Sequence, residues 1–180
     1  MPELYRMQDS YKKAQNIKVL ILDVDGVLTD GRLFFDEQGK EYKAFNTRDG
    51  LGIRLLQKAG IQVAVISGRS SIPVALRMKN LDIELVYLGQ SDKRFAFKEI
   101  IEEVGCTPLQ AAYVGDDLID LPVLVRAGLA VAVQDANTHI LPYVDWQTQH
   151  LGGQGAVREV CDFILQAQGK LDAIIDAYLA

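Results

Sequence analysis

The sequence has no long apolar run, few cysteines and no basic cluster. No apolar stretch in its 180 residues approaches the ~18–20 residues that a membrane helix needs, and the first residues lack the pattern of a secretory leader. Cys106 and Cys161 form neither a CxxC motif nor a disulfide framework, which fits a reducing compartment. The longest basic run is Lys12-Lys13, and 24 acidic against 19 basic side chains give a net charge of −5. We expect a cytoplasmic protein whose main partner is neither nucleic acid nor a membrane.

The chain has the length and composition of one globular domain. With 49% hydrophobic side chains it can bury a core, so we expect residues 1–180 to form a single domain. Short apolar runs alternate with segments of helical periodicity, which is typical of a parallel sheet covered by helices on both faces. The pattern predicts a doubly wound α/β fold that binds ligands at the carboxyl ends of its strands. The expected strands are 19–22, 63–66, 85–88, 111–114 and 129–133.

Two segments interrupt this alternation. Residues 32–36 and 41–45 flank a turn at Gly39, which predicts a β-hairpin over 32–45, inserted before the next helix. Because an isolated hairpin is marginally stable in water, its aromatic side chains need a surface to pack against. Residues 152–180 begin with a glycine-rich stretch and continue with amphipathic periodicity, so we expect a C-terminal tail and helix there.

Two clusters of aspartates follow expected strands. Segment 23–30 carries three aspartates after the first strand, where Gly26 allows a sharp exit, and segment 116–120 carries three more after strand 111–114. Any one aspartate, taken alone, is more readily explained as a turn former in a solvated loop. Because the doubly wound topology brings strand ends to one edge, the two clusters should converge there and need a cation. Hard oxygen ligands favour Mg²⁺.

Two other expected strands end in residues that suit a phosphate group. Ser67-Gly68-Arg69 follows strand 63–66, and Lys93 follows strand 85–88. A hydroxyl with backbone N–H groups at a helix start forms an anion cradle, and Lys93 adds a positive charge. Alone, Ser67 is as readily a helix cap and Lys93 a surface lysine. Four polar sites in order, each just after its own strand, favour an enzyme that handles phosphate.

At these four sites the chain resembles the haloacid dehalogenase superfamily of phosphotransferases. The four motifs match, in order, Asp23-Val24-Asp25-Gly26-Val27-Leu28-Thr29, Ser67, Lys93 and Gly115-Asp116-Asp117, over nearly the whole chain. The resemblance implies Asp23 as the nucleophile and Asp25 as the acid and then the base, with Ser67 and Lys93 on the phosphoryl oxygens. It also implies Mg²⁺ held by the Asp23 carboxylate, the Asp25 main-chain carbonyl and Asp116. We expect Asp117 and Asp120 to orient Lys93 or the waters of the metal.

The chain has no room for the cap domain with which members of that superfamily usually choose substrates. Between Asp25 and Ser67 there is space only for the hairpin, one helix and one strand. A lone subunit would leave its site open to water, which is unfavourable for selective phosphoryl transfer. We therefore expect a homo-oligomer in which a neighbouring subunit covers the site. The same contact would cover the apolar hairpin residues Leu33, Phe34, Phe35, Tyr42 and Phe45.

Further motifs narrow the resemblance to the 3-deoxy-D-manno-octulosonate 8-phosphate phosphatases, a tetrameric family. The shared features are the capless form, the Asp-Gly-Val-Leu-Thr-Asp-Gly signature, segment 46–50 and segment 152–159. That family releases free Kdo for bacterial lipopolysaccharide, and guanidinium groups suit the carboxylate and phosphate of its substrate. The resemblance implies that segment 152–155 reaches toward a neighbour's site. It also implies substrate contacts from Asn46, Thr47, Arg48, Asp49, Gly50, Arg54, Arg69 and Arg77, although Arg54 and Arg77 suit solvated helix faces equally well.

Three other functions stay open at the level of sequence. A phosphatase for a nonulosonic acid 9-phosphate, or for another small sugar phosphate, would need the same chemistry. A phospho-receiver domain is also doubly wound, with clustered aspartates, a hydroxyl and a lysine. It lacks an acid two residues after the nucleophile and such a hairpin. A non-catalytic scaffold domain would not need the complete set of motifs.

Overall fold

Six parallel strands form the central sheet of the computed structural model, which describes residues 3–179. They are β1 (Val19–Leu22), β4 (Gln62–Ile66), β5 (Leu85–Tyr87), β6 (Ala111–Gly115), β7 (Leu129–Ala132) and β8 (Trp146–Gln147). Their order across the sheet is β5-β4-β1-β6-β7-β8, so the chain winds outward from β1 in both directions. The predicted doubly wound α/β fold is confirmed. Strand β8 was not predicted, because two residues carry no periodicity.

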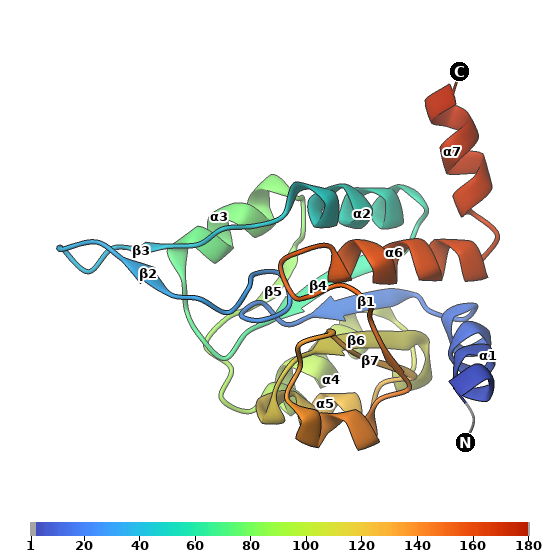
Figure 1. Ribbon diagram of the computed structural model, residues 1–180, viewed down its shortest axis with the longest axis horizontal. Coiled ribbons are helices and arrows are strands. Elements are labelled where there is room, and N and C mark those ends of the chain that lie inside the picture. The colour runs from blue at the N-terminus through green and yellow to red at the C-terminus, as the bar shows by residue number, and fades with distance from the viewer. Residues whose placement is uncertain (1–2, 180) are drawn as a thin grey trace.

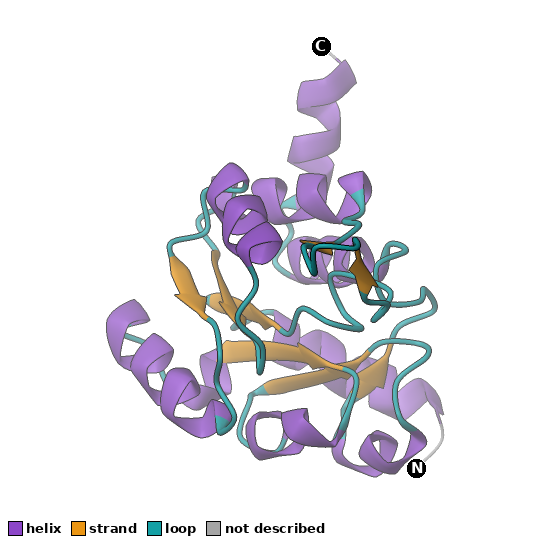
Figure 2. Ribbon diagram, turned by 90° about the vertical axis from the view of Figure 1, so that its left-hand side faces the viewer, coloured by secondary structure: helices purple, strands orange, loops and turns teal. Residues whose placement is uncertain are grey.

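Helices cover both faces of this sheet. Figure 1 shows α2 (Thr47–Lys58), α3 (Ile72–Asn80) and α6 (Ala156–Ala167) on one side of the strands, and α4 (Lys93–Val104) and α5 (Leu121–Leu124) on the other. The N-terminal α1 (Glu3–Ala14) contacts α6, and three short 3-10 helices are η1 (Pro108–Gln110), η2 (Leu118–Asp120) and η3 (Thr138–Tyr143). In Figure 2 the strands lie between the two helical layers, and the C-terminal α7 (Leu171–Leu179) stands apart from them. Among the described residues no helix is long and apolar enough to cross a membrane.

Burial explains why β1 lies at the centre of the sheet. All four of its residues are fully buried, and both of its edges are paired, with Leu22 opposite Val65 of β4 and Val114 of β6. A strand that is covered on both faces must be apolar throughout, as Val19–Leu22 is. Because β4, β1 and β6 are parallel and end at matching positions, the polar residues that follow them meet at one edge of the sheet.

The hairpin is built from two very short strands. Strands β2 (Phe34–Phe35) and β3 (Glu41–Tyr42) pair antiparallel, with Phe34 opposite Tyr42. The sequence predicted longer strands over 32–36 and 41–45. Figure 1 shows the hairpin projecting from the end of the molecule that lies farthest from α1. Its aromatic residues stay half-exposed, at 50% for Phe34 and 57% for Phe35, so the described residues of this chain do not supply the surface that they need.

The glycine-rich segment 152–155 is not a free tail. Its backbone lies on the loop that follows β1, where Gly153 N–H donates to the Val27 carbonyl at 2.9 Å. A Cβ on Gly152 would lie 1.7 Å from the Gly26 oxygen, so only glycine permits this close approach. Residues 152–155 are thus anchored within their own chain and lead directly into α6, and the expectation that this segment also reaches toward a neighbouring subunit stays a prediction.

Candidate active site

Four polar groups lie where strands of the sheet end. Asp23, Ser67 and Asp116 are the first residues after β1, β4 and β6, which are adjacent in the sheet. Lys93 is the first residue of α4, the helix that follows β5, and the Asp92 side chain caps that helix by accepting a hydrogen bond from Arg94 N–H. The four predicted motifs thus lie at the carboxyl ends of four adjacent strands, β5, β4, β1 and β6.

Lys93 lies at the centre of a buried polar cluster. Its side chain is 0% exposed, and its Nζ donates to Asp23 Oδ1 at 2.7 Å, to Asp120 Oδ1 at 2.7 Å and to the Tyr113 hydroxyl at 3.2 Å. Burial alone lowers the pKa of Lys93, but the neighbouring Asp23 and Asp120 outweigh it, so the pKa is raised overall. The lysine therefore remains a cation. Three acceptors fix the position of its charge beside the Asp23 carboxylate.

Asp120 connects the members of this cluster through both of its carboxylate oxygens. Its Oδ1 accepts from Lys93 and, at 2.6 Å, from the Tyr113 hydroxyl, while its Oδ2 accepts from the backbone N–H groups of Asp116 and Asp117 at 2.9 and 3.1 Å. The pKa of Tyr113 is raised well above its usual value by burial and by the nearby carboxylates, so its hydroxyl stays protonated and donates. These contacts place Asp120 behind Lys93, as the sequence predicted. The Asp117 side chain does not reach Lys93 and binds Leu118 N–H and Asn137 instead.

The carboxylates at this edge repel one another. Oxygens of Asp23, Asp116 and Asp120 all lie within 4.8 Å of each other. Burial, followed by the charge of Asp120, raises the pKa of Asp23 to about 6. Burial, followed by the charges of Asp23 and Asp120, raises the pKa of Asp116 to about 8. One lysine does not balance three carboxylates, so this donor set fits a divalent cation with oxygen ligands.

Gly26 allows the two aspartate loops to approach each other. It has φ +93°, and a Cβ at this position would lie 2.1 Å from Asp116 Oδ2. Any other residue would push the Asp116 carboxylate out of the cluster. The predicted sharp exit after Asp25 therefore also makes room for the second acidic loop.

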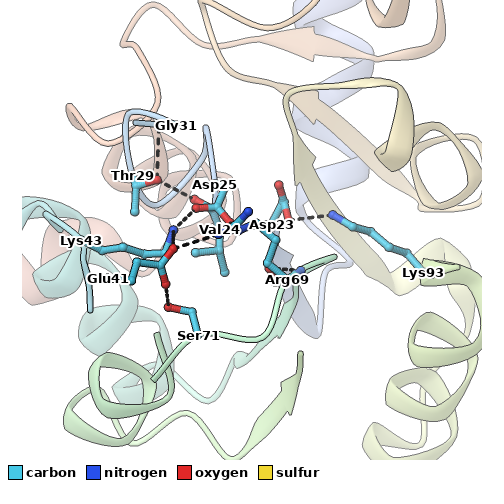
Figure 3. A network of polar contacts seen from close by, with 11 residues as sticks. Asp23, Val24, Asp25, Thr29, Gly31, Glu41, Lys43, Arg69, Ser71 and Lys93 are labelled. Carbon is cyan, nitrogen blue, oxygen red and sulfur yellow. Dashed lines mark hydrogen bonds and ion pairs between the residues drawn. The ribbon is translucent and has the colours of Figure 1, made fainter. Parts of the chain in front are cut away.

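Asp25 points away from this cluster, toward the hairpin. Figure 3 shows its carboxylate beside the ammonium group of Lys43, to which it is ion-paired, while Asp23 faces Lys93 on the other side of the loop. The Arg69 Nε lies 3.8 Å from Asp25 Oδ2, and Glu41 lies next to Lys43 and Arg69. Two carboxylates that are two residues apart thus have different cationic partners.

Sequence reasoning missed Lys43, Glu41 and Tyr113. The signal for the first two was the two-residue period of a strand, which puts Glu41 and Lys43 on one face of the second hairpin segment and residues 42 and 44 on the other. In the structure the face with residues 42 and 44 is exposed, and the Lys43 side chain is buried. The signal for Tyr113 was a lone hydroxyl in a fully buried strand, which must find a hydrogen-bond partner.

The start of α2 holds the glycine-rich segment in place. The Asn46 side chain caps α2 by accepting from Arg48 N–H at 2.8 Å and donates to the Gly153 carbonyl at 3.3 Å. Arg48 donates to the Gln154 carbonyl at 3.4 Å, and Asp49 accepts from Arg158 N–H at 2.8 Å in the first turn of α6. Burial raises the pKa of Asp49. Asn46, Arg48 and Asp49 therefore have partners within the fold, and of these three only the Arg48 side chain is exposed.

The remaining predicted substrate residues fall into two groups. Arg77 lies against the start of α2, where it donates to the Asn46 carbonyl at 3.5 Å; a Cβ on Gly50 would lie 2.4 Å from Arg77 Nη2. Thr47 is exposed as the first residue of α2. Arg54 is different, because its guanidinium binds Asp82 and the Asn80 carbonyl in the turn that precedes β5. That turn lies at the opposite edge of the sheet, so within this chain Arg54 is not part of the site.

The fold and this set of residues are those of a haloacid dehalogenase-like hydrolase. The family model with that description matches residues 83–160, which contain Lys93, Asp116 and Asp120. The two segments that could hold a cap domain are short. Within the described residues only the hairpin lies between β1 and α2, and only α3 lies between β4 and β5.

Close relatives place the chain in one family within this class of hydrolases. The chain is 52% identical to the 3-deoxy-D-manno-octulosonate 8-phosphate phosphatase of Escherichia coli K12 over 91% of this chain and 87% of that protein. The crystal structure of that phosphatase from Yersinia pestis matches with a TM-score of 0.90 and 51% identity, covering 91% of this chain and 89% of the other. The enzyme from Moraxella catarrhalis, solved with magnesium, phosphate and Kdo, matches with a TM-score of 0.93 and 41% identity over 96% and 99% of the two chains. This chain belongs to the same family of phosphatases. Membership of that family argues against the receiver and scaffold alternatives.

Proposed function

We propose that this chain hydrolyses 3-deoxy-D-manno-octulosonate 8-phosphate to Kdo and inorganic phosphate with the help of Mg²⁺. The observation that carries the proposal is the pairing of buried Asp23 with Lys93 beside Asp116, in a chain that is 52% identical to a phosphatase for this substrate. A carboxylate that is held by a buried lysine at the open end of a parallel sheet can attack an incoming phosphoryl group.

The acidic cluster fits the metal. The carboxylates of Asp23 and Asp116, with the main-chain carbonyl of Asp25, would hold Mg²⁺ and leave positions for water and phosphate. The third carboxylate in the cluster, Asp120, already accepts four hydrogen bonds and serves better as a support for Lys93. When bound, the cation supplies positive charge that offsets the repulsion between the carboxylates and the charge of the phosphoryl oxygens.

Two aspartates divide the reaction between them. An Asp23 oxygen attacks phosphorus while Asp25 gives a proton to the leaving sugar oxygen, which produces an aspartyl phosphate and the free sugar acid. Asp25 then takes a proton from water as that water attacks phosphorus, and Asp23 is released with inorganic phosphate. Lys93 and Ser67 stabilise the charge on the phosphoryl oxygens throughout.

The arginines near the site suit the rest of the substrate. Arg48, Arg69 and Arg77 all lie at the end of the molecule where the hairpin joins α2 and α3, and the side chain of Arg69 is 47% exposed. A guanidinium can bind a carboxylate through two parallel hydrogen bonds, so these residues would recognise the acid group of Kdo. Thr47, at the start of α2, is exposed to contribute a hydroxyl.

A neighbouring subunit completes the site in this proposal. The half-exposed hairpin residues Phe34, Phe35 and Tyr42 form an apolar surface next to an open site, which favours a homo-oligomer, and a tetramer by analogy with the family. A phosphatase of this kind acts in the cytoplasm on the route to lipopolysaccharide. Sedimentation that finds only monomers at micromolar concentration would contradict the oligomer.

The test is phosphate release from a panel of substrates in the presence and absence of Mg²⁺. The panel contains Kdo 8-phosphate, a nonulosonate 9-phosphate, hexose phosphates and p-nitrophenyl phosphate, and the Asp23→Asn variant is the control. We expect a preference of orders of magnitude for Kdo 8-phosphate. A preference for the nonulosonate 9-phosphate would mean that this ester is the substrate, and the proposed reaction mechanism would be unchanged. No phosphate release from any ester would overturn the proposed function.

A further inference from the structure

Lys43 is a buried cation on an exposed hairpin. It follows β3, and its side chain is 0% exposed, whereas its neighbour Tyr42 is 49% exposed. Its two ion-pair partners are both carboxylates, Asp25 and Glu41, with the Glu41 oxygen at 3.4 Å. A buried ammonium group is stable only among compensating charges, so these two carboxylates determine where Lys43 lies.

Glu41 fixes Lys43 to the body of the protein. Its Oε2 accepts from the Ser71 hydroxyl at 2.5 Å, and its Oε1 accepts from Arg69 Nη2 at 3.1 Å. Ser71 directly precedes α3, and Arg69 lies in the loop after β4. The hydrogen bond from Ser71, together with the two nearby cations, lowers the pKa of Glu41, so this carboxylate stays charged. Figure 3 shows Lys43 between the Glu41 and Asp25 carboxylates. The hairpin is thereby connected both to α3 and to the loop after β1.

The two carboxylate oxygens of Asp25 have different neighbours. Lys43 donates to Oδ1, whereas the cationic Arg69 Nε lies 3.8 Å from Oδ2, beyond hydrogen-bond range. Oδ2 is therefore the oxygen that is free to exchange a proton with a leaving group or a water molecule. The Asp25 side chain is 21% exposed, so without Lys43 it could rotate into other orientations.

We propose that Lys43 is a positioning residue, which holds Asp25 in the orientation needed for proton transfer and makes the hairpin part of the catalytic unit of its own chain. This inference rests on the proposed role of Asp25 as acid and base. Lys43 itself transfers no proton. Asp25 donates its proton as the bond between phosphorus and the sugar oxygen breaks, and Lys43 keeps the carboxylate in place.

The dependence on the leaving group tests this role. An alkyl phosphate needs protonation of its leaving oxygen, whereas p-nitrophenyl phosphate releases a stable anion and hardly needs it. We would measure the rate of the first step, transfer of the phosphoryl group to Asp23, by rapid mixing with p-nitrophenyl phosphate and with the best alkyl phosphate of the panel, because the second step is common to both esters. The variants are Lys43→Met, Lys43→Arg and Lys43→Met in an Asp25→Asn background. The matched control is Lys40→Met, because Lys40 lies on the same hairpin but over the ring of Tyr42, 5.3 Å from its centroid.

A selective loss is the expected result. Lys43→Met should lower the rate of this first step for the alkyl ester by about 10–100-fold and for the aryl ester by less than about 3-fold, since acid–base catalysis contributes roughly 100-fold or more. Lys43→Arg should recover most of the loss, Lys40→Met should match the parent, and Lys43→Met should cost nothing further in the Asp25→Asn background. Equal losses on both esters, or a further loss in that background, would overturn the inference alone. No phosphate release from the parent would overturn the proposed function as well.

Discussion

The two aspartates of the first loop are only two residues apart but depend on different parts of the molecule. Asp23 is 5% exposed and is held by Lys93, which is in turn fixed by Asp120 and Tyr113 within the core. Asp25 is held by Lys43 from a hairpin whose strands pair over two residues each. Folding of the sheet is therefore enough to position Asp23, the proposed nucleophile, whereas Asp25, the proposed acid and base, is positioned only when the hairpin is in place.

The largest expected effect is a difference between the kinetics of the Asp23→Asn and Asp25→Asn variants. Asp23→Asn removes the attacking oxygen, so turnover of every ester should fall by about 1,000-fold or more. Asp25→Asn keeps the nucleophile, so p-nitrophenyl phosphate should give a burst of about one nitrophenolate per chain and then stop, because water is no longer activated. Rapid-mixing absorbance measures the burst. A burst from Asp23→Asn, or its absence from Asp25→Asn, would contradict the division of roles.

A second difference should appear in stability. Lys93→Met leaves Asp23 and Asp120 buried without their cation, and breaking a buried ion pair in this way costs about 3–5 kcal/mol of unfolding free energy. Lys43→Met acts on Asp25 and Glu41, which stay partly exposed at 21% and 12%, and should cost less, about 1–2 kcal/mol. Urea denaturation of both variants measures the two losses. Equal losses would mean that the hairpin contributes as much to the fold as the core cluster does.

Tyr113→Phe should lower the unfolding free energy by less than Lys93→Met does, although it also acts on the buried cluster around Lys93. It removes one donor from Asp120, which keeps Lys93 and two backbone N–H groups, so we expect a loss of about 1–2 kcal/mol. For a chain of this size each kcal/mol lowers the Tm by roughly 2–4 °C. Thermal unfolding gives the shift, with Tyr143→Phe as the control because Tyr143 is 55% exposed. The same Tm for both variants would show that the Tyr113 hydroxyl does not support Asp120.

The smallest expected effect is the pH dependence of the stabilisation by Mg²⁺, which binds at the acidic cluster of Asp23 and Asp116. Because the pKa of Asp116 rises from 3.8 to about 8 on folding without metal, the folded state holds a proton that the unfolded chain has lost. That stabilisation is complete below pH 3.8 and disappears as the pH rises through about 8. Mg²⁺ needs the ionised carboxylate, so it should raise the Tm by a few degrees more at pH 8 than at pH 6. Calorimetry tests this, and Asp116→Asn should abolish the difference.

Much of the Asp23 side could be predicted because its residues follow apolar strands. A run such as Val19–Leu22 can only be a strand buried on both faces, and parallel strands put the residues that follow them at one edge. The sequence therefore predicts that Asp23, Asp116 and Lys93 lie together at this edge. Their roles in catalysis stay predictions until the variants are measured.

The Asp25 side was harder to predict because short strands leave little pattern. The hairpin was expected, but its strands are shorter than predicted, and the partners Lys43 and Glu41 went unnoticed among its aromatic residues. The arginines show the same limit. Helical periodicity says that Arg54 lies on α2, but the register of α2 against the turn before β5 decides that it binds Asp82.

The sequence by itself determined the doubly wound arrangement of the strands, the edge at which the candidate site forms and most of the residues that meet there. These follow from burial and from the handedness of parallel crossovers, which depend on local patterns. Only the tertiary structure decided which cation faces each aspartate, that segment 152–155 packs on its own loop, and that Tyr113 supports Asp120. Such pairings join residues far apart in the chain, and they depend on side-chain packing that no local pattern encodes.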